Sequence, residues 1–256
     1  MNNNVTLKSI KMKKNILALL LLLASSPIFA HYMWIETVPT GKLNKEHQIK
    51  VRFGEYTYGV LEKVDGDAFK GVSEFTVWII APNGQKKELT LTPGADFYAG
   101  TFVPSENGTY TVVLDNKNMK VLDYTEYDFG IFKPQYHAKA RIVVGETIAP
   151  LATSNPEGIE IVDLTDKTYA KADEVVLQLL YKGKPLAKNE LSVYQADMWS
   201  KKLTTDEEGK VSFKLPWNTQ YTVEATYNEE VPGNFKGLDY GFVWHCATYC
   251  IPAPKN

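Results

Sequence analysis

The stretch SEFTVWIIAPNGQKKELTLTPGADFYAGTFVPSENGTYTVVLDN, residues 73–116, decides the fold. Apolar and polar residues alternate along it, and the turn sequences Pro82-Asn83-Gly84 and Glu106-Asn107-Gly108 interrupt the alternation. A period of two indicates half-buried β-strands, and turns at such short spacing are typical of a β-sandwich. We therefore expect an all-β fold, with strands in this stretch over residues 73–82, 86–93, 95–104 and 109–116.

The same pattern continues on both sides of this stretch. Residues 47–54 alternate before it, and residues 136–145 are expected to be the closing strand of a first unit. Residues 146–158 contain two prolines and no periodicity, which is typical of a connecting segment. The sequence thus predicts two β-sandwich domains, residues 31–147 and 159–256, joined by a linker at 148–158.

The second half contains several further alternating segments. We expect its strands at 160–165, 174–186, 189–197, 201–216, 220–227 and 240–251, with a hairpin turn at 206–209. The run from Gly183-Lys184-Pro185-Leu186 to Ala225 resembles the prealbumin-like and carboxypeptidase-regulatory-like modules. This resemblance implies an immunoglobulin-like β-sandwich and little about activity, because such modules serve many functions.

Residues 1–30 are organised like a cleaved secretory signal peptide. Four lysines and no acidic residue precede the apolar run at 16–24, which is shorter than the roughly 20 residues that span a bilayer. Small residues end at Ala30, where we expect cleavage, with Ala24 or a neighbouring serine as the main alternative. We predict a periplasmic protein, or alternatively a secreted one, without a transmembrane anchor.

The charge of the mature chain excludes one class of partner. Without the four lysines of the signal peptide, 24 basic residues remain against 30 acidic ones, so the formal charge is −6. Nucleic acids and anionic membranes are bound by basic surfaces. We therefore expect no nucleic-acid partner.

Cleavage after Ala30 would make His31 the N-terminal residue. Its α-amine, first amide and imidazole could then chelate one borderline ion such as nickel or copper. The candidate further ligands are His137, at the polar edge of 136–145, and His245, within 240–251. A structural role stays open for all three, because no zinc-type spacing of histidines and cysteines occurs. His47 lies in a polar stretch and is expected to face solvent.

Cys246, Cys250 and Glu36 are possible additional ligands. In an extended strand Cys246 and Cys250 share a face with Thr248, opposite His245, and their Cα atoms lie about 13 Å apart. A disulfide needs about 7 Å or less, so it would require a turn in this segment; otherwise the two are free thiols or soft metal ligands. Glu36 could face the same side of the first strand as Trp34.

Recognisable catalytic motifs are missing from the sequence. It contains no G-x-S-x-G, P-loop or dinucleotide-binding fingerprint, and the acidic segments 64–69 and 205–209 are expected to be solvated turns. Tyr56 and Tyr58 alternate and could stack on a sugar, or be ordinary strand or loop aromatics. We therefore expect a binding protein rather than an enzyme.

Several short motifs together resemble the domain-of-unknown-function family 4198. They are HYMWIE at 31–36 directly after the signal peptide, YHAKA at 136–140, the turn-rich second half, and Ala247-Thr248 near the end of the chain. The resemblance implies two β-sandwich domains. It also implies a link to transition metals, because members are described as periplasmic components of cobalt or nickel uptake. The cysteines that flank Ala247-Thr248 depart from the family pattern.

The function expected from the sequence is periplasmic capture or delivery of nickel, cobalt or copper, with a membrane metal transporter as a possible partner. The main alternative is an extracytoplasmic adhesion or carbohydrate-binding protein. A copper oxygenase with a histidine brace is a further alternative, but no second active-site histidine is marked in the sequence.

Overall fold

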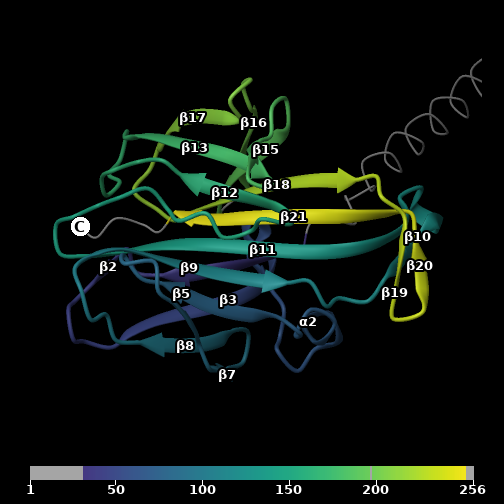
Figure 1. Ribbon diagram of the computed structural model, residues 1–256, viewed down its shortest axis with the longest axis horizontal. Helices are drawn as coiled ribbons and strands as arrows, with labels where there is room; N and C mark the ends of the chain where they lie inside the picture. The colour runs from purple at the N-terminus through teal and green to yellow at the C-terminus, as the bar shows by residue number, and fades with distance from the viewer. Residues whose placement is uncertain (1–30, 197, 252–256) are drawn as a thin grey trace, which may run out of the picture. The chain divides into compact units, whose positions relative to one another are not determined.

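A computed structural model describes residues 31–196 and 198–251 (Figure 1). The chain divides into two units, Met1–His31 and Tyr32–Asn256. The predicted signal peptide, residues 1–30, lies outside the described residues. The described residues form mainly strands, and their helices are short turns: η1 (Tyr56–Tyr58), α2 (Asp67–Lys70) and η2 (Thr125–Tyr127). The predicted all-β class is confirmed. None of the described helices has the length and apolar character needed to cross a membrane.

The first sheet contains the strand that follows His31. Its order is β1 (Tyr32–Thr37), β3 (His47–Glu55), β8 (Tyr98–Phe102) and β7 (Leu91–Pro93), and β4 (Val60–Leu61) also pairs with β3. All of these pairings are antiparallel. β3 alternates buried and partly exposed side chains from His47 to Arg52, as its sequence pattern predicts.

The central sheet has ten strands and draws on both halves of the sequence. Its order is β16 (Trp199–Thr204), β15 (Glu190–Gln195), β18 (Tyr221–Glu229), β21 (Phe242–Ile251), β11 (Gly130–Val144), β9 (Gly108–Asn116), β5 (Thr76–Ile80) and β6 (Lys86–Glu88). β2 (Thr40–Gly41) and β10 (Leu122–Tyr124) also pair with β11. In Figure 1, β11 and β21 run side by side between the strands of the two halves.

The remaining strands belong to the second half. The third sheet contains β12 (Ile159–Asp163), β13 (Glu174–Tyr181), β14 (Lys184–Pro185) and β17 (Lys210–Lys214), and a separate hairpin contains β19 (Gly233–Phe235) and β20 (Leu238–Tyr240). The inner side chains of β12, β13, β17 and β18 form an apolar core with Ala247, Tyr249 and Ile251 of β21. This packing is the sandwich that the alternation predicts, whereas its immunoglobulin-like character stays a prediction.

The parallel pair of β11 and β21 is covered on both faces. Thr248 donates a hydrogen bond of 2.6 Å to the carbonyl of Met33 in β1, whereas the hydroxyl of the next residue, Tyr249, donates one of 2.7 Å to Asp163 in β12. Successive side chains of a strand point to opposite faces, so β1 and β12 cover opposite sides of the pair. This explains why every residue of β21 is buried.

The structure corrects two predictions about neighbouring strands. A turn does form at 206–209, but the segments that flank it do not form a hairpin: β16 pairs with β15 in the central sheet, and β17 pairs with β13 in the third. Likewise, the expected strand 86–93 divides into β6 and β7, which belong to different sheets. Alternation alone carries no information about which sheet a strand joins.

The predicted linker connects a strand of the central sheet to a strand of the third sheet. Residues 146–158 contain no strand, and they join β11 to β12. The predicted domains on either side of it share the central sheet, because β11 from the first half pairs with β21 from the last ten described residues. The boundary at 147–148 stays a prediction, and any hinge at the linker would have to break this pairing.

Candidate functional site

The pair of β11 and β21 positions two of the three candidate histidines. In its register Gln135 lies opposite His245, and His137 lies opposite Ala247. Directly opposed residues share a face, so His137 and His245 both point toward β12, and Cys246 points toward β1. The predicted separation of His245 from the two cysteines is therefore confirmed.

His137 is held between a carboxylate and a hydroxyl. Its Nδ1 lies 2.6 Å from Oδ1 of Asp115 in β9, and its Nε2 lies 3.2 Å from Oγ of Ser154 in the segment between β11 and β12. The ring is 3% exposed. Burial lowers the pKa of His137, and the hydrogen bond to Asp115 only partly opposes this effect. The ring is consequently neutral at neutral pH.

A buried ion pair adjoins this histidine. The ammonium of Lys139 contacts Oε2 of Glu160 in β12, and both side chains are almost fully buried. The same Oε2 accepts hydrogen bonds from the amide nitrogen of Ser154, at 2.8 Å, and from its Oγ, at 3.2 Å. Lys139 also donates to the carbonyl of Ala152, at 2.8 Å. Asp115, His137, Ser154, Glu160 and Lys139 thus form one polar network, which we call the β12-side network.

His245 belongs to a second pairing at the other end of this face. Its Nε2 lies 3.0 Å from Oε2 of Glu229 in β18, and Glu229 also contacts the ammonium of Lys182. Burial lowers the pKa of His245, and Glu229 opposes this effect in part. His245 is therefore occupied by a carboxylate partner of its own.

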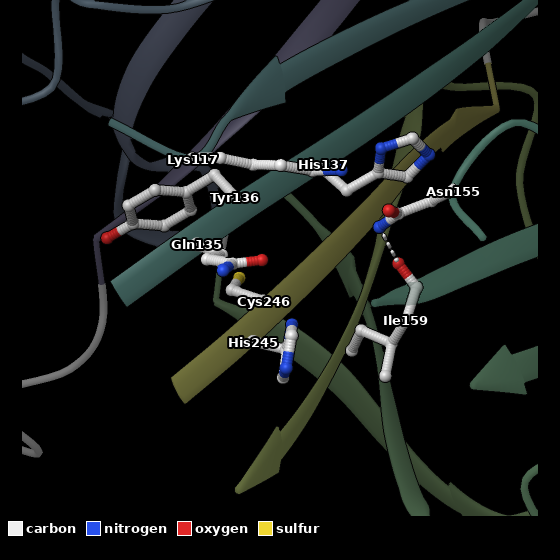
Figure 2. A pocket seen from close by; sticks show the side chains of 8 residues that line it. All are labelled: Lys117, Gln135, Tyr136, His137, Asn155, Ile159, His245 and Cys246. Atoms are coloured by element: carbon white, nitrogen blue, oxygen red, sulfur yellow. Dashed lines mark hydrogen bonds between the residues drawn. The ribbon is translucent and has the colours of Figure 1, made fainter. Parts of the chain in front are cut away.

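The space between the two histidines is closed. It is lined by both rings together with Gln135, Asn155, Ile159 and Cys246 among others, and it leaves no room for a water molecule. Figure 2 shows Asn155 in the region between His137 and His245, with its amide bonded to the carbonyl of Ile159 at 2.9 Å. His137 and His245 therefore do not fit a shared metal site in this arrangement.

The opposite face of the pair is mainly apolar and contains both thiols. Cys246 and Cys250 are buried and not joined in a disulfide. The Cys246 thiol lies 3.6 Å from Oε1 of Glu224 in β18. Burial raises the pKa of both thiols well above the usual value, which disfavours the thiolate that binds soft metals. Burial also raises the pKa of Glu224, to about 7.

Glu36 and His47 have structural partners in the first sheet. Glu36 accepts a hydrogen bond from the Trp34 indole at 3.0 Å and an ion-pair contact from Arg52 at 2.6 Å, so it does face the same side as Trp34. His47 was expected to face solvent, and this expectation is wrong: it is 5% exposed, and its Nε2 lies 2.8 Å from Oγ1 of Thr37. The polar sequence around it concealed an inward-facing position at the start of β3.

The candidate metal ligands are thus not brought together within Tyr32–Ile251. Among residues 31–196 and 198–251, no group of three histidine, cysteine or acidic side chains is arranged to hold a metal ion. His31 directly precedes β1 and belongs to the N-terminal unit, Met1–His31. Unlike the other predicted ligands, His31 would supply several donor atoms from one residue.

Sequence reasoning missed the partners of the histidines. Asp115, Ser154, Glu160 and Glu229 lie on β9, the connecting segment, β12 and β18, and no fixed spacing links them to His137 or His245. A weak signal was available: Lys139 and Arg141 alternate with Ala138, Ala140 and Ile142 along β11. Cations on a buried strand face require acidic partners, since an unpaired buried charge is costly.

Comparison with known proteins identifies the family. The family described as "Domain of unknown function (DUF4198)" matches residues 28–229, so the chain belongs to it. No curated protein matches. A solved structure with some similarity is that of a Salmonella alpha-2-macroglobulin mutant, Y1175G, at 13% identity and a TM-score of 0.29. That comparison covers 90% of this chain and 15% of the other, so the chain spans only a small part of that protein's length.

Proposed function

We propose that this protein is exported and captures a transition metal ion, nickel, cobalt or copper, through an N-terminal His31. The observation that carries the proposal is the position of His31 directly after the small-residue cleavage pattern that ends at Ala30. After cleavage, the amine, first amide and imidazole of this one residue supply nitrogen donors suited to such ions.

The arrangement of the other histidines limits the proposal to His31. His137 and His245 each have a carboxylate partner and face a closed space, so neither is available without breaking its pairing. A chelate made by one residue needs no movement of these buried networks. The ion would therefore be held at the N-terminus, where a membrane metal transporter could receive it.

The test is native mass spectrometry of protein purified from the periplasm, followed by titration with nickel, cobalt and copper. We expect a mass that begins at His31 and takes up one ion. His31→Ala removes the imidazole and should lose the ion, whereas His245→Gln removes a buried ring outside the proposed chelate and should keep it. Equal binding by all three proteins, or none by the native one, would disprove the proposal.

A further inference from the structure

Ser154 belongs to the β12-side network and also lines an open groove. The groove has a volume of about 530 Å³, and its lining includes Ile80, Lys86, Thr153, Ser154, Pro156 and Glu160. His137 lies on the closed side of Ser154. A small molecule in the groove could therefore contact the Ser154 hydroxyl while the histidine behind it stays shielded from water.

The three side chains have the relations of a nucleophile, a base and a residue that orients the base. The Ser154 hydroxyl is 3.2 Å from Nε2 of His137, and Nδ1 of the same ring is 2.6 Å from Asp115. Such a constellation is recognised by geometry and roles, and it occurs on unrelated folds in different chain orders. We propose that Asp115, His137 and Ser154 act as a serine-hydrolase triad on small carboxylic esters bound in this groove.

The protonation of the ring suits this role. Asp115 accepts a hydrogen bond from Nδ1–H, which leaves the lone pair of Nε2 directed toward Ser154. The hydroxyl has a second acceptor, Oε2 of Glu160, also at 3.2 Å. That oxygen already receives the ammonium of Lys139 and the amide of Ser154, so its charge is largely compensated. The hydroxyl proton rests on Oε2 of Glu160 in this arrangement, and rotation about the Cβ–Oγ bond turns it to Nε2, which lies at the same distance of 3.2 Å.

The segment that carries Ser154 is held in place on both sides. The amide of Ala152 donates to the Thr111 hydroxyl at 3.1 Å, and the amide of Leu151 donates to the carbonyl of Asp163 at 3.0 Å. The first bond attaches the segment to β9, which also carries Asp115, and the second attaches it to β12. Catalytic groups need such fixed positions, because their contribution depends on orientation.

The lining of the groove defines the substrate class. Ile80 and Pro156 supply apolar surface for a short acyl chain. Lys86 also lines the groove, and its ammonium, which lies 4.0 Å from the centre of the Trp78 ring, would turn from that ring toward the oxygen that becomes negative during attack. The volume limits the ligand to a small molecule. A short-chain carboxylic ester meets these requirements.

The reaction is balanced without a cofactor. Oγ of Ser154 bonds to the ester carbonyl carbon and gives its proton to Nε2 of His137. The carbon–alkoxide bond then breaks, the leaving oxygen takes the proton from Nε2, and an acyl-serine remains. Water attacks this acyl group, Nε2 accepts the water's proton and returns it to Oγ, and the carboxylic acid leaves. The net change is ester plus water to acid plus alcohol.

The experiment treats the purified, processed protein with a fluorophosphonate in EDTA, so that an ion at His31 cannot contribute. We expect a covalent adduct that peptide mapping places on Ser154. Hydrolysis of p-nitrophenyl acetate should fall at least about 100-fold in Ser154→Ala. The matched control is Ser200→Ala, which removes an exposed hydroxyl on β16, outside the groove, and should hydrolyse at the native rate.

Asp115→Asn separates a positioning role from a structural one. It should lower kcat at least about 100-fold and leave KM unchanged, because Asp115 orients His137 without touching the substrate. An adduct on any other residue, no adduct on folded native protein, or equal hydrolysis by native protein and Ser154→Ala would overturn the proposal. The adduct mapping uses unmodified protein, so it holds even if a variant fails to fold.

Discussion

Both faces of the β11–β21 pair are covered, but they differ in whether their buried charged side chains have partners of opposite charge. On the β12 side, four pairs of ionisable groups are matched: His137 with Asp115, Lys139 with Glu160, Arg141 with Asp163, and His245 with Glu229, whereas Lys133 at the edge of this face donates to the carbonyl of Lys117. On the β1 side, Glu224 is buried and its carboxylate lies 3.6 Å from the Cys246 thiol. Its bonded partners among the described residues are the Cys246 thiol and the Tyr194 hydroxyl, neither of which is a cation.

The difference shows in the pKa values of the acids. On the β12 side, the charge of Lys139 and its hydrogen bond together outweigh burial and lower the pKa of Glu160. On the β1 side, burial raises the pKa of Glu224 to about 7. The comparison teaches that burial alone does not determine the charge of an acid; the presence of a cation on the same face decides it.

The largest effect is expected from breaking a pair on the β12 side. Lys139→Met leaves the Glu160 carboxylate buried without its cation and should lower the free energy of unfolding by about 3–5 kcal/mol. Urea denaturation measures this loss. Lys202→Met is the matched control, because its pairing with Glu190 is exposed and should be worth about 0.5 kcal/mol. Equal losses in the two variants would show that the buried pair contributes no more to the free energy of unfolding than the exposed pair does.

An intermediate and pH-dependent effect is expected on the β1 side. The pKa of Glu224 rises from 4.5 to about 7 on folding, so between these values the folded state holds a proton that the unfolded state has released. Its contribution to stability is greatest below pH 4.5, falls as the pH rises, and is lost above 7, for a total of about 3 kcal/mol. Glu224→Gln cannot ionise and should avoid this loss.

The measurement is the difference in unfolding free energy between Glu224→Gln and the native protein at pH 5 and at pH 8. We expect the variant's advantage to grow across this interval. Glu190→Gln changes an exposed acid and should show a difference that stays nearly constant. A constant difference for Glu224→Gln as well would mean that a cation compensates this carboxylate after all.

The smallest effect concerns a neutral member of the β12 side. Tyr249→Phe removes the 2.7 Å hydrogen bond to Oδ2 of Asp163, which also pairs with Arg141. We expect a loss of about 1–2 kcal/mol, because the charge of Asp163 stays compensated by Arg141. Thermal unfolding with Tyr127→Phe as the exposed control measures this loss. A loss as large as that of Lys139→Met would show that hydrogen bonds, and not charge pairing, govern this face.

Much of the local structure could be predicted from the sequence. The strand pattern at 47–54 appears as β3, and the expected last strand appears as β21, with His245 and Cys246 on the predicted faces. These predictions succeed because alternation is a property of a single strand. The His47 prediction failed for a related reason. Neighbouring polar residues do not determine whether one side chain is buried, and the His47 ring is buried against a hydroxyl from another strand, that of Thr37.

The candidate sites show the limit of this approach. The sequence could offer His137 and His245 as candidate metal ligands, but it could not supply their partners, since Asp115 and Glu229 come from other strands. Ser154 was hidden for the same reason: it lies in a proline-containing segment that the sequence identifies only as a connection.

The sequence by itself determined the all-β class, the direction in which side chains of each strand point, and membership of a family recognised over residues 28–229. Only the tertiary structure decided that β16 and β17 enter different sheets, that β11 pairs with β21, and that each buried histidine has an acidic partner. The physical reason is that alternation depends on the geometry of one strand, whereas pairing and charge compensation depend on contacts between residues far apart in the chain.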